Sequence, residues 1–149
     1  MAVKPIPKGY HSVTTYIVVP GVAKLLDFLK QSFGAKERGR FARPDGGIMH
    51  AEVKIGNSVV MMGEPMDRQT PMPACIYLYV KDADAVYRRA LEAGASSVAE
   101  PADQFYGDRR GGIKDPFGNQ WWIATHTEDV APEEMQRRSE AVMKQAAGQ

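Results

Sequence analysis

The sequence predicts an α+β protein built from two copies of a βαβββ unit, each a strand and a helix followed by three strands. A strand, a turn, an amphipathic helix and a glycine stop follow one another at residues 17–35 and again at 78–95. A Gly-Ile pair comes later in each copy, and then a Gly-Asn turn precedes an apolar strand, at Gly56 and at Gly118. Such a repeat indicates a pseudo-symmetric body in which a curved sheet surrounds a cleft, and we expect the functional side chains in that cleft.

Length and composition place the chain among ordinary globular domains. Its 149 residues suit one domain, and 44% hydrophobic with 25% charged residues is a typical balance. The net charge of +1 does not indicate the basic surface that nucleic-acid-binding proteins usually carry. No apolar run approaches the roughly 20 residues that span a bilayer, so no membrane partner is expected. No secretory leader pattern opens the chain, and we expect a cytoplasmic protein.

The first unit is expected at about residues 10–64. Its helix has apolar residues at helical spacing and ends at Gly34, a residue that tolerates the left-handed conformation. Residues 43–47 read as a hairpin turn because Pro sets φ and Gly accepts positive φ. The expected strands are 12–19, 37–41, 48–55 and 58–62, around a helix at 22–33.

The second unit is expected at about residues 74–128, after a proline-rich linker, so that both units form one domain at 10–130. The expected strands are 74–80, 97–99, 109–114 and 120–125, with a helix at 83–93 and a loop at 101–107. An extra helix or tail at 131–149 begins near Pro132. Its thin apolar seam of Met135, Val142 and Met143 suits packing on the body or on a second subunit, and a solvated tail is the alternative.

Several segments resemble one known superfamily in order and spacing. They are Tyr-His-Ser-Val-Thr at 10–14, Pro-Asp-Gly-Gly-Ile-Met-His-Ala-Glu at 44–52, Asp-Gln-Phe-Tyr-Gly-Asp-Arg at 103–109, Asp-Pro-Phe-Gly-Asn at 115–119 and Ala-Thr-His-Thr-Glu-Asp-Val at 124–130. With the repeat, they resemble the vicinal oxygen chelate superfamily of glyoxalases, bleomycin resistance proteins and dioxygenases, and within it the PhnB-like branch. The resemblance implies the glyoxalase/bleomycin resistance fold, a small organic ligand and a homodimer.

Metal-using members of that superfamily place one ligand on the first and last strand of each unit. The corresponding residues here are Thr14, Val60, Cys75 and Trp122, with Met61 replacing Val60 if the register shifts by one. Divalent ions bind carboxylate, imidazole or several oxygen atoms, which these side chains do not supply. We therefore expect neither a glyoxalase-type metal nor another cofactor, and we expect Cys75 to be a buried, inert thiol.

Three candidate catalytic residues stand on strands or at their ends. His50 and Glu52 share the polar face of an alternating strand, where an imidazole beside a carboxylate could exchange protons with a ligand. Asp108 follows the 101–107 loop and is the alternative partner of His50. The competing interpretation is that this face is simply solvated.

Candidate ligand-binding residues are mostly aromatic. Alternation places Tyr16, Tyr77, Tyr79 and Trp122 on the cleft side, where they could stack on a planar ligand or instead fill the cleft. Gln104 and Arg109 come from the 101–107 loop and its following strand. Arg109 could present its guanidinium to an anion, or could lock the hairpin together with Asp108.

Three functions follow from these residues. The leading hypothesis is a metal-independent protein that binds a small organic molecule in an aromatic cleft. The second is a lyase or isomerase that uses His50 with Glu52 or Asp108, with a metal at non-standard positions as a variant. The third is a scaffold whose cleft is filled by its own side chains.

Overall fold

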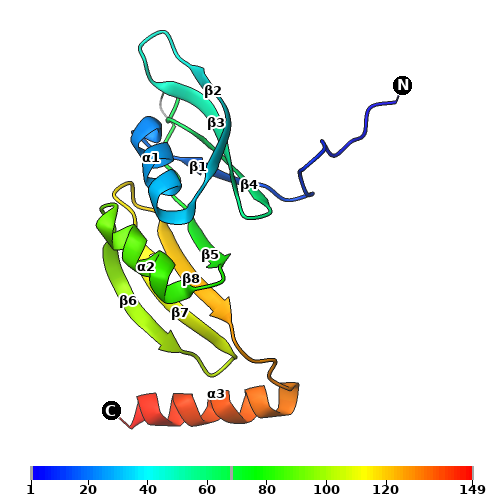
Figure 1. The fold of residues 1–149 in the computed structure, drawn as a ribbon, viewed down its shortest axis with the longest axis vertical. Helices are drawn as coiled ribbons and strands as arrows, with labels where there is room; N and C mark the ends of the chain where they lie inside the picture. The colour runs from blue at the N-terminus through cyan, green and yellow to red at the C-terminus, as the bar shows by residue number, and fades with distance from the viewer. Residues whose placement is uncertain (1, 68, 149) are drawn as a thin grey trace.

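The computed structural model describes residues 2–67 and 69–148 and contains the two predicted βαβββ units in order (Figure 1). The first unit comprises β1 (Thr15–Val18), α1 (Val22–Phe33), β2 (Lys36–Ala42), β3 (Ile48–Ile55) and β4 (Ser58–Gly63). The second comprises β5 (Cys75–Tyr79), α2 (Ala83–Glu92), β6 (Ser96–Asp103), β7 (Asp108–Lys114) and β8 (Gln120–His126). The predicted α+β class and the repeat are confirmed.

The eight strands form two separate four-stranded sheets. Their orders are β1-β4-β3-β2 and β5-β8-β7-β6, and in each the first strand runs parallel to its neighbour while the remaining pairs are antiparallel. No strand ladder joins the two sheets within the described residues. The units contact each other through α1 and α2, which lie side by side in Figure 1.

One hydrophobic core lies between the helices and the sheets. Leu25, Leu26 and Leu29 of α1 are fully buried, and they belong to the same cluster as Ile113, Trp121 and Ile123 of the second sheet. The ring of Phe33, at the end of α1, packs 4.7 Å from the ring of Trp121 between centroids. Each fully buried residue of this size contributes roughly 1.5–3 kcal/mol, so this core holds the two units together.

The turn before β8 is fixed by one buried carboxylate. Asp115 accepts hydrogen bonds from the backbone N–H of Phe117 (2.9 Å) and of Asn119 (3.0 Å), from the Asn119 amide (2.9 Å) and from the Trp121 indole (3.0 Å). Asn119 in turn accepts a bond from the backbone N–H of Ala74 at the start of the repeat, at 2.9 Å. This network sets which residues of β8 face the core and which face outward.

β6 is longer than the sequence suggested. The expected strand at 97–99 extends from Ser96 to Asp103, with two register shifts opposite β7, and the expected loop at 101–107 is shortened to residues 104–107. Pro101 lies within it although proline cannot donate to a ladder. The strand tolerates Pro101 because it forms the edge of its sheet.

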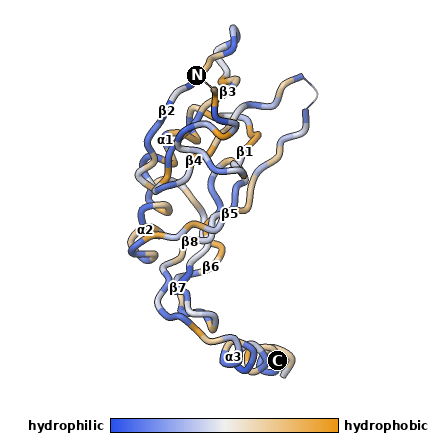
Figure 2. The backbone as a smooth tube through the Cα atoms, turned by 90° about the vertical axis from the view of Figure 1, so that its right-hand side faces the viewer, coloured by the Kyte–Doolittle hydropathy of each residue, from blue (hydrophilic) through white to orange (hydrophobic). Residues whose placement is uncertain are grey.

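The third helix, α3 (Pro132–Ala147), follows the repeat as predicted and projects from the end of the second sheet (Figures 1 and 2). None of its residues is buried, and Val142 and Met143 are 46% and 68% exposed. Val142 and Met143 of the expected apolar seam therefore face solvent, while Met135 is half-buried. Gln149, the last residue of the predicted tail, lies outside the described residues.

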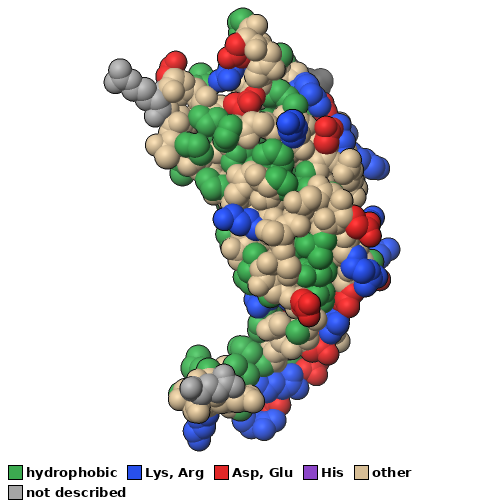
Figure 3. All heavy atoms as spheres, turned by 90° about the vertical axis from the view of Figure 1, so that its left-hand side faces the viewer, with side chains coloured by type: hydrophobic (Ala, Val, Ile, Leu, Met, Phe, Trp, Pro, Cys, Tyr) green, Lys and Arg blue, Asp and Glu red, His purple; other side chains and the backbone are tan. Residues whose placement is uncertain are grey.

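The surface carries charges of both signs. In the view of Figure 3, Lys and Arg side chains alternate with Asp and Glu along one edge of the molecule and on α3. None of the helices in the described part of the chain is both long and apolar enough to span a bilayer.

Candidate functional site

Two clusters of polar and aromatic side chains occupy the outer faces of the two sheets, opposite the helices. The register places Tyr16 beside Met61 on the first sheet and Tyr77 beside Trp122 on the second. These positions correspond to one another in the repeat. Because the helix-side residues of the same strands are buried, alternation leaves the outer faces exposed to solvent.

The first cluster is a chain of four hydrogen-bonded side chains. The Tyr10 hydroxyl donates to one oxygen of Glu52, and the other oxygen lies 3.0 Å from Nε2 of His50. The Tyr16 hydroxyl is 3.1 Å from Nδ1 of the same imidazole. Hydrogen bonds from His50 and Tyr10 lower the pKa of Glu52, and the bond to Glu52 raises the pKa of Tyr10. The structure thus joins the predicted pair His50 and Glu52.

The second cluster surrounds the buried carboxylate of Asp108. One of its oxygens accepts hydrogen bonds from the hydroxyls of Tyr77 (2.7 Å) and Tyr79 (2.8 Å), and the other lies 2.8 Å from Nδ1 of His126. Burial raises the pKa of Asp108, but the bonds from His126, Tyr77 and Tyr79 outweigh it and leave the pKa below its usual value. Asp108 is therefore held as an anion, which makes it a poor proton acceptor.

The tyrosines of this cluster are fixed by the same network. Burial, followed by the hydrogen bonds to Tyr106 and Asp108, raises the pKa of Tyr77, and the bond to Asp108 raises the pKa of Tyr79. The Tyr106 hydroxyl lies 3.2 Å from that of Tyr77. Both strand tyrosines are thus neutral donors, with their hydroxyls anchored and their rings 39% and 60% exposed.

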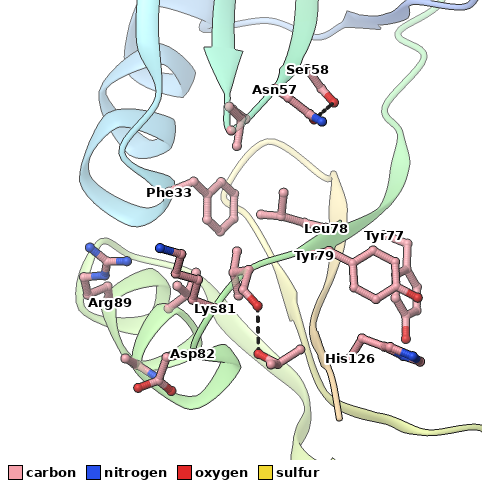
Figure 4. Close-up of a pocket in the computed structure, with 16 residues that line it drawn as sticks. Phe33, Asn57, Ser58, Tyr77, Leu78, Tyr79, Lys81, Asp82, Arg89 and His126 are labelled. Atoms are coloured by element: carbon pink, nitrogen blue, oxygen red, sulfur yellow. Dashed lines mark hydrogen bonds between the residues drawn. The ribbon is translucent and has the colours of Figure 1, made fainter. Parts of the chain in front are cut away.

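A groove runs from this cluster toward α2. It has a volume of about 1020 Å³, and Tyr77, Tyr79 and His126 lie at one end while Lys81 and Arg89 lie at the other (Figure 4). Its middle is apolar, because Phe33, Leu78, Val80 and Val86 line it. A smaller cavity of about 220 Å³, lined by Tyr10, Thr14 and Tyr77 among others, lies where the first and second sheets approach each other.

The structure does not gather every predicted residue into one site. Asp108 hydrogen-bonds His126 rather than His50. Gln104 donates its amide to the Ala102 carbonyl at 3.2 Å. Tyr16 lies on the first sheet and the remaining predicted aromatics on the second. The expected cleft where the halves meet is thus divided between two faces, because α1 and α2, rather than the sheets, form the main contact between units.

The guanidinium of Arg109 forms ion pairs within the second unit. Its Nε and Nη2 donate to the two carboxylate oxygens of Asp84 at 2.7 and 2.9 Å, and Nη1 lies 3.3 Å from Asp103. These bonds tie β7 to α2 and β6, so Arg109 is held by Asp84 and Asp103 and not together with Asp108 as the alternative expected. Asp108 lies on the opposite face of β7.

The side chains at the four positions compared above with metal-ligand positions do not suit a divalent ion. Val60 is buried in the core, so the register places Met61 on the outer face instead. Thr14, Met61, Cys75 and Trp122 offer a hydroxyl, a thioether, one thiol and an indole, which do not fit a divalent ion. Cys75 is exposed, contrary to expectation, because it begins the edge strand β5 on its outer face.

Two side chains of the second face, His126 and Arg110, were not among the expected ligand-binding or catalytic residues. His126 continues the alternation of Trp122 and Ala124 on β8, which could have paired it with Asp108, its direct neighbour across the ladder. Arg110 lies two residues from Asp108 on β7, and its guanidinium carbon is 4.1 Å from the centre of the Trp122 ring. Alternation along β7 could have shown that Arg110 lies on the same face as Asp108.

Comparisons with known proteins agree with this fold. An uncharacterized protein of Mycobacterium bovis is 35% identical over 136 residues, which cover 84% of this chain and 90% of that protein. The crystal structure of TioX from Micromonospora sp. ML1 superposes with a TM-score of 0.67 at 23% identity, over 78% of this chain and 98% of that chain. The crystal structure of a glyoxalase/bleomycin resistance protein/dioxygenase family enzyme from Burkholderia phytofirmans PsJN superposes with a TM-score of 0.61 at 17% identity. The superposition covers 76% of this chain and 96% of that chain.

The family model matches most of the chain. It covers residues 10–123, from Tyr10 of the first cluster into β8. The βαβββ repeat and the superposed structures agree with that match. The chain belongs to the Glyoxalase/Bleomycin resistance protein/Dioxygenase superfamily.

Proposed function

We propose that this protein is a PhnB-like member of the superfamily that binds a small organic molecule on the outer face of β5 and β8, without a glyoxalase-type metal. The observation that carries the proposal is the set of three aromatic side chains on the outer face of the second sheet, where Tyr77 and Tyr79 are exposed and Trp122 is half-buried. Exposed rings can stack on a planar ligand, whereas rings that filled a cleft would be buried.

The fixed geometry of the tyrosines supports binding. Asp108 accepts both hydroxyls, so the two rings keep one orientation and lose little freedom when a ligand covers them. The rings of Tyr77 and Tyr79 are 5.2 Å apart between centroids and tilted by 52°. The adjoining groove supplies the apolar surface that a small-molecule site requires.

Calorimetric titration with naphthamide, a neutral planar probe, tests this proposal. We expect binding by the wild type and at least a tenfold weaker affinity in Trp122→Leu. Phe41→Leu is the matched control, because Phe41 is an aromatic residue 63% exposed on the first sheet. If neither the wild type nor the control binds the probe, or if both substitutions weaken it equally, the second-sheet face is not the site.

Acid–base catalysis at the first cluster is a second candidate, favoured by the 3.0 Å contact between His50 and Glu52. Here Glu52 would orient the imidazole, and the neighbouring Tyr16 hydroxyl would face the ligand. His50→Gln should abolish any turnover found for a lyase or isomerase substrate while ligand affinity stays within about twofold. Unchanged turnover in that variant would remove this candidate.

We also propose a homodimer, because extended faces with exposed aromatic and aliphatic residues suit a second copy. Val13, Phe41 and Tyr79 are 88%, 63% and 60% exposed. Light scattering coupled to gel filtration gives the mass directly. A monomer mass at micromolar concentration would contradict the dimer without affecting the ligand proposal.

A further inference from the structure

Arg110 is the cation on the aromatic face of the second sheet whose guanidinium edge stays available. Its guanidinium carbon lies over the Trp122 ring, 4.1 Å from the ring centre. Stacking uses the face of the guanidinium and leaves its N–H groups directed outward in the plane. Within the described residues, Arg110 has no hydrogen bond or ion pair with a carboxylate.

The nearest carboxylate on that face does not neutralise this charge. Asp108 precedes Arg110 by two residues on β7, so both point outward, but its oxygens accept bonds from Tyr77, Tyr79 and His126. The raised pKa of His126 favours a protonated imidazole beside it. Three other side chains thus already occupy the Asp108 carboxylate, and Arg110 is not among them.

The neighbouring arginine shows the contrast. Arg109 points to the other face of β7, where Asp84 accepts two of its N–H groups and Asp103 a third. The two consecutive arginines therefore differ in their contacts. Arg109 forms a structural ion pair with Asp84, whereas Arg110 lies over the Trp122 ring without a carboxylate partner among the described residues.

Gly112 keeps Arg110 and Trp122 in this arrangement. It lies opposite Trp122 in the β7–β8 ladder, and a Cβ at Gly112 would come within 2.5 Å of the indole ring. The indole can therefore lie flat across β7, next to Arg110. A larger residue would push the ring away from Arg110.

Resting on the proposed function, we infer that the ligand of this face is an organic anion, a planar molecule with a carboxylate or a similar oxyanion that Arg110 binds. Tyr77, which lies beside Trp122 across β5 and β8, would stack on the planar part, while Trp122 supports Arg110. The guanidinium would donate two parallel N–H bonds to the oxyanion. Since the cation is stacked and half-buried, its contribution should exceed that of a free surface charge.

A pair of probes of the same shape tests this inference. Naphthoate is ionised at neutral pH and naphthamide is neutral, so their affinities differ mainly by the charge. We expect the wild type to bind naphthoate about tenfold more tightly, and we expect Arg110→Gln to abolish this preference while its affinity for naphthamide changes by less than about twofold. The preference should also shrink as salt is added.

Arg89→Gln is the matched control, because Arg89 is a cation at the other end of the groove (Figure 4). If Arg89→Gln rather than Arg110→Gln removes the preference, the anion binds at α2 and the inference is wrong. Equal affinity of the wild type for the two probes overturns the inference but leaves the proposed function intact. Failure of both probes to bind contradicts the proposed function itself.

Discussion

His126 Nδ1 lies 2.8 Å from the buried carboxylate of Asp108, and Nε2 of the same ring lies 2.7 Å from the exposed carboxylate of Asp129. One imidazole thus joins the aromatic face of the second sheet to the segment that leads into α3. The hydrogen bond that the imidazole makes to Asp108, followed by the one to Asp129, raises the pKa of His126 above its ordinary value.

This relationship predicts a pH-dependent contribution to stability. Because the folded-state pKa of His126 is raised, the stabilisation is fully present below about pH 6.5, the unfolded value, and is lost as pH rises through the folded pKa. We expect wild type and His126→Gln to differ most in unfolding free energy at acidic pH, and to converge at alkaline pH. A difference that grows with rising pH in urea titrations would contradict this assignment.

Asp115→Ala should be the most destabilising change at a turn. It removes the acceptor of two backbone N–H groups, the Asn119 amide and the buried Trp121 indole, and each unpaired buried donor costs about 1–3 kcal/mol before relaxation. We expect a loss of about 3–5 kcal/mol in denaturant unfolding. Asp45→Ala is the control, because Asp45 accepts a backbone N–H bond in an exposed turn and should cost about 1 kcal/mol or less.

Gly112→Ala tests the close approach of Trp122. Because the added methyl would overlap the indole, we expect about 1–3 kcal/mol of destabilisation and a red-shifted Trp emission as the ring moves toward solvent. Gly39→Ala in β2 is the control, since its Cβ would meet nothing within 4 Å, and it should change stability by less than about 1 kcal/mol. Equal effects of the two substitutions would mean that the indole does not require a glycine beneath it.

Arg138 should decide whether α3 remains attached. Its side chain donates to Glu134 at 2.8 Å, to Glu128 at 2.5 Å and to the Phe105 carbonyl at 3.1 Å, so it links the helix to the loop before β7. We expect Arg138→Ala to accelerate amide exchange across residues 128–131 and the loop at 104–107. Arg137→Ala removes an ion pair within the helix only and should leave that exchange unchanged.

The repeat and its elements could be predicted because their signals are local. Helical spacing ending at Gly34, alternation along β3 and the two Gly-Asn turns each depend on neighbouring residues, and the observed strands and helices follow them. Alternation also placed Tyr77, Tyr79 and Trp122 correctly on one face.

The features that the sequence did not predict depend on contacts between residues distant in the sequence. The sequence alone does not show which of the adjacent Arg109 and Arg110 forms an ion pair. Their contacts differ because Asp84 of α2 lies on one side of β7 and Trp122 of β8 lies on the other. The division of the expected cleft follows from helix packing between the units, which the repeat itself does not specify. The continuation of β6 through Pro101 depends on its position at the sheet edge.

The most direct test of the central claim is the location of a bound planar ligand. Intermolecular nuclear Overhauser effects between naphthamide and the protein should connect the probe to the rings of Tyr77 and Trp122, while the buried Trp121 indole, hydrogen-bonded to Asp115, shows none. Contacts confined to Tyr16, His50 and Phe41 on the first sheet would contradict the account.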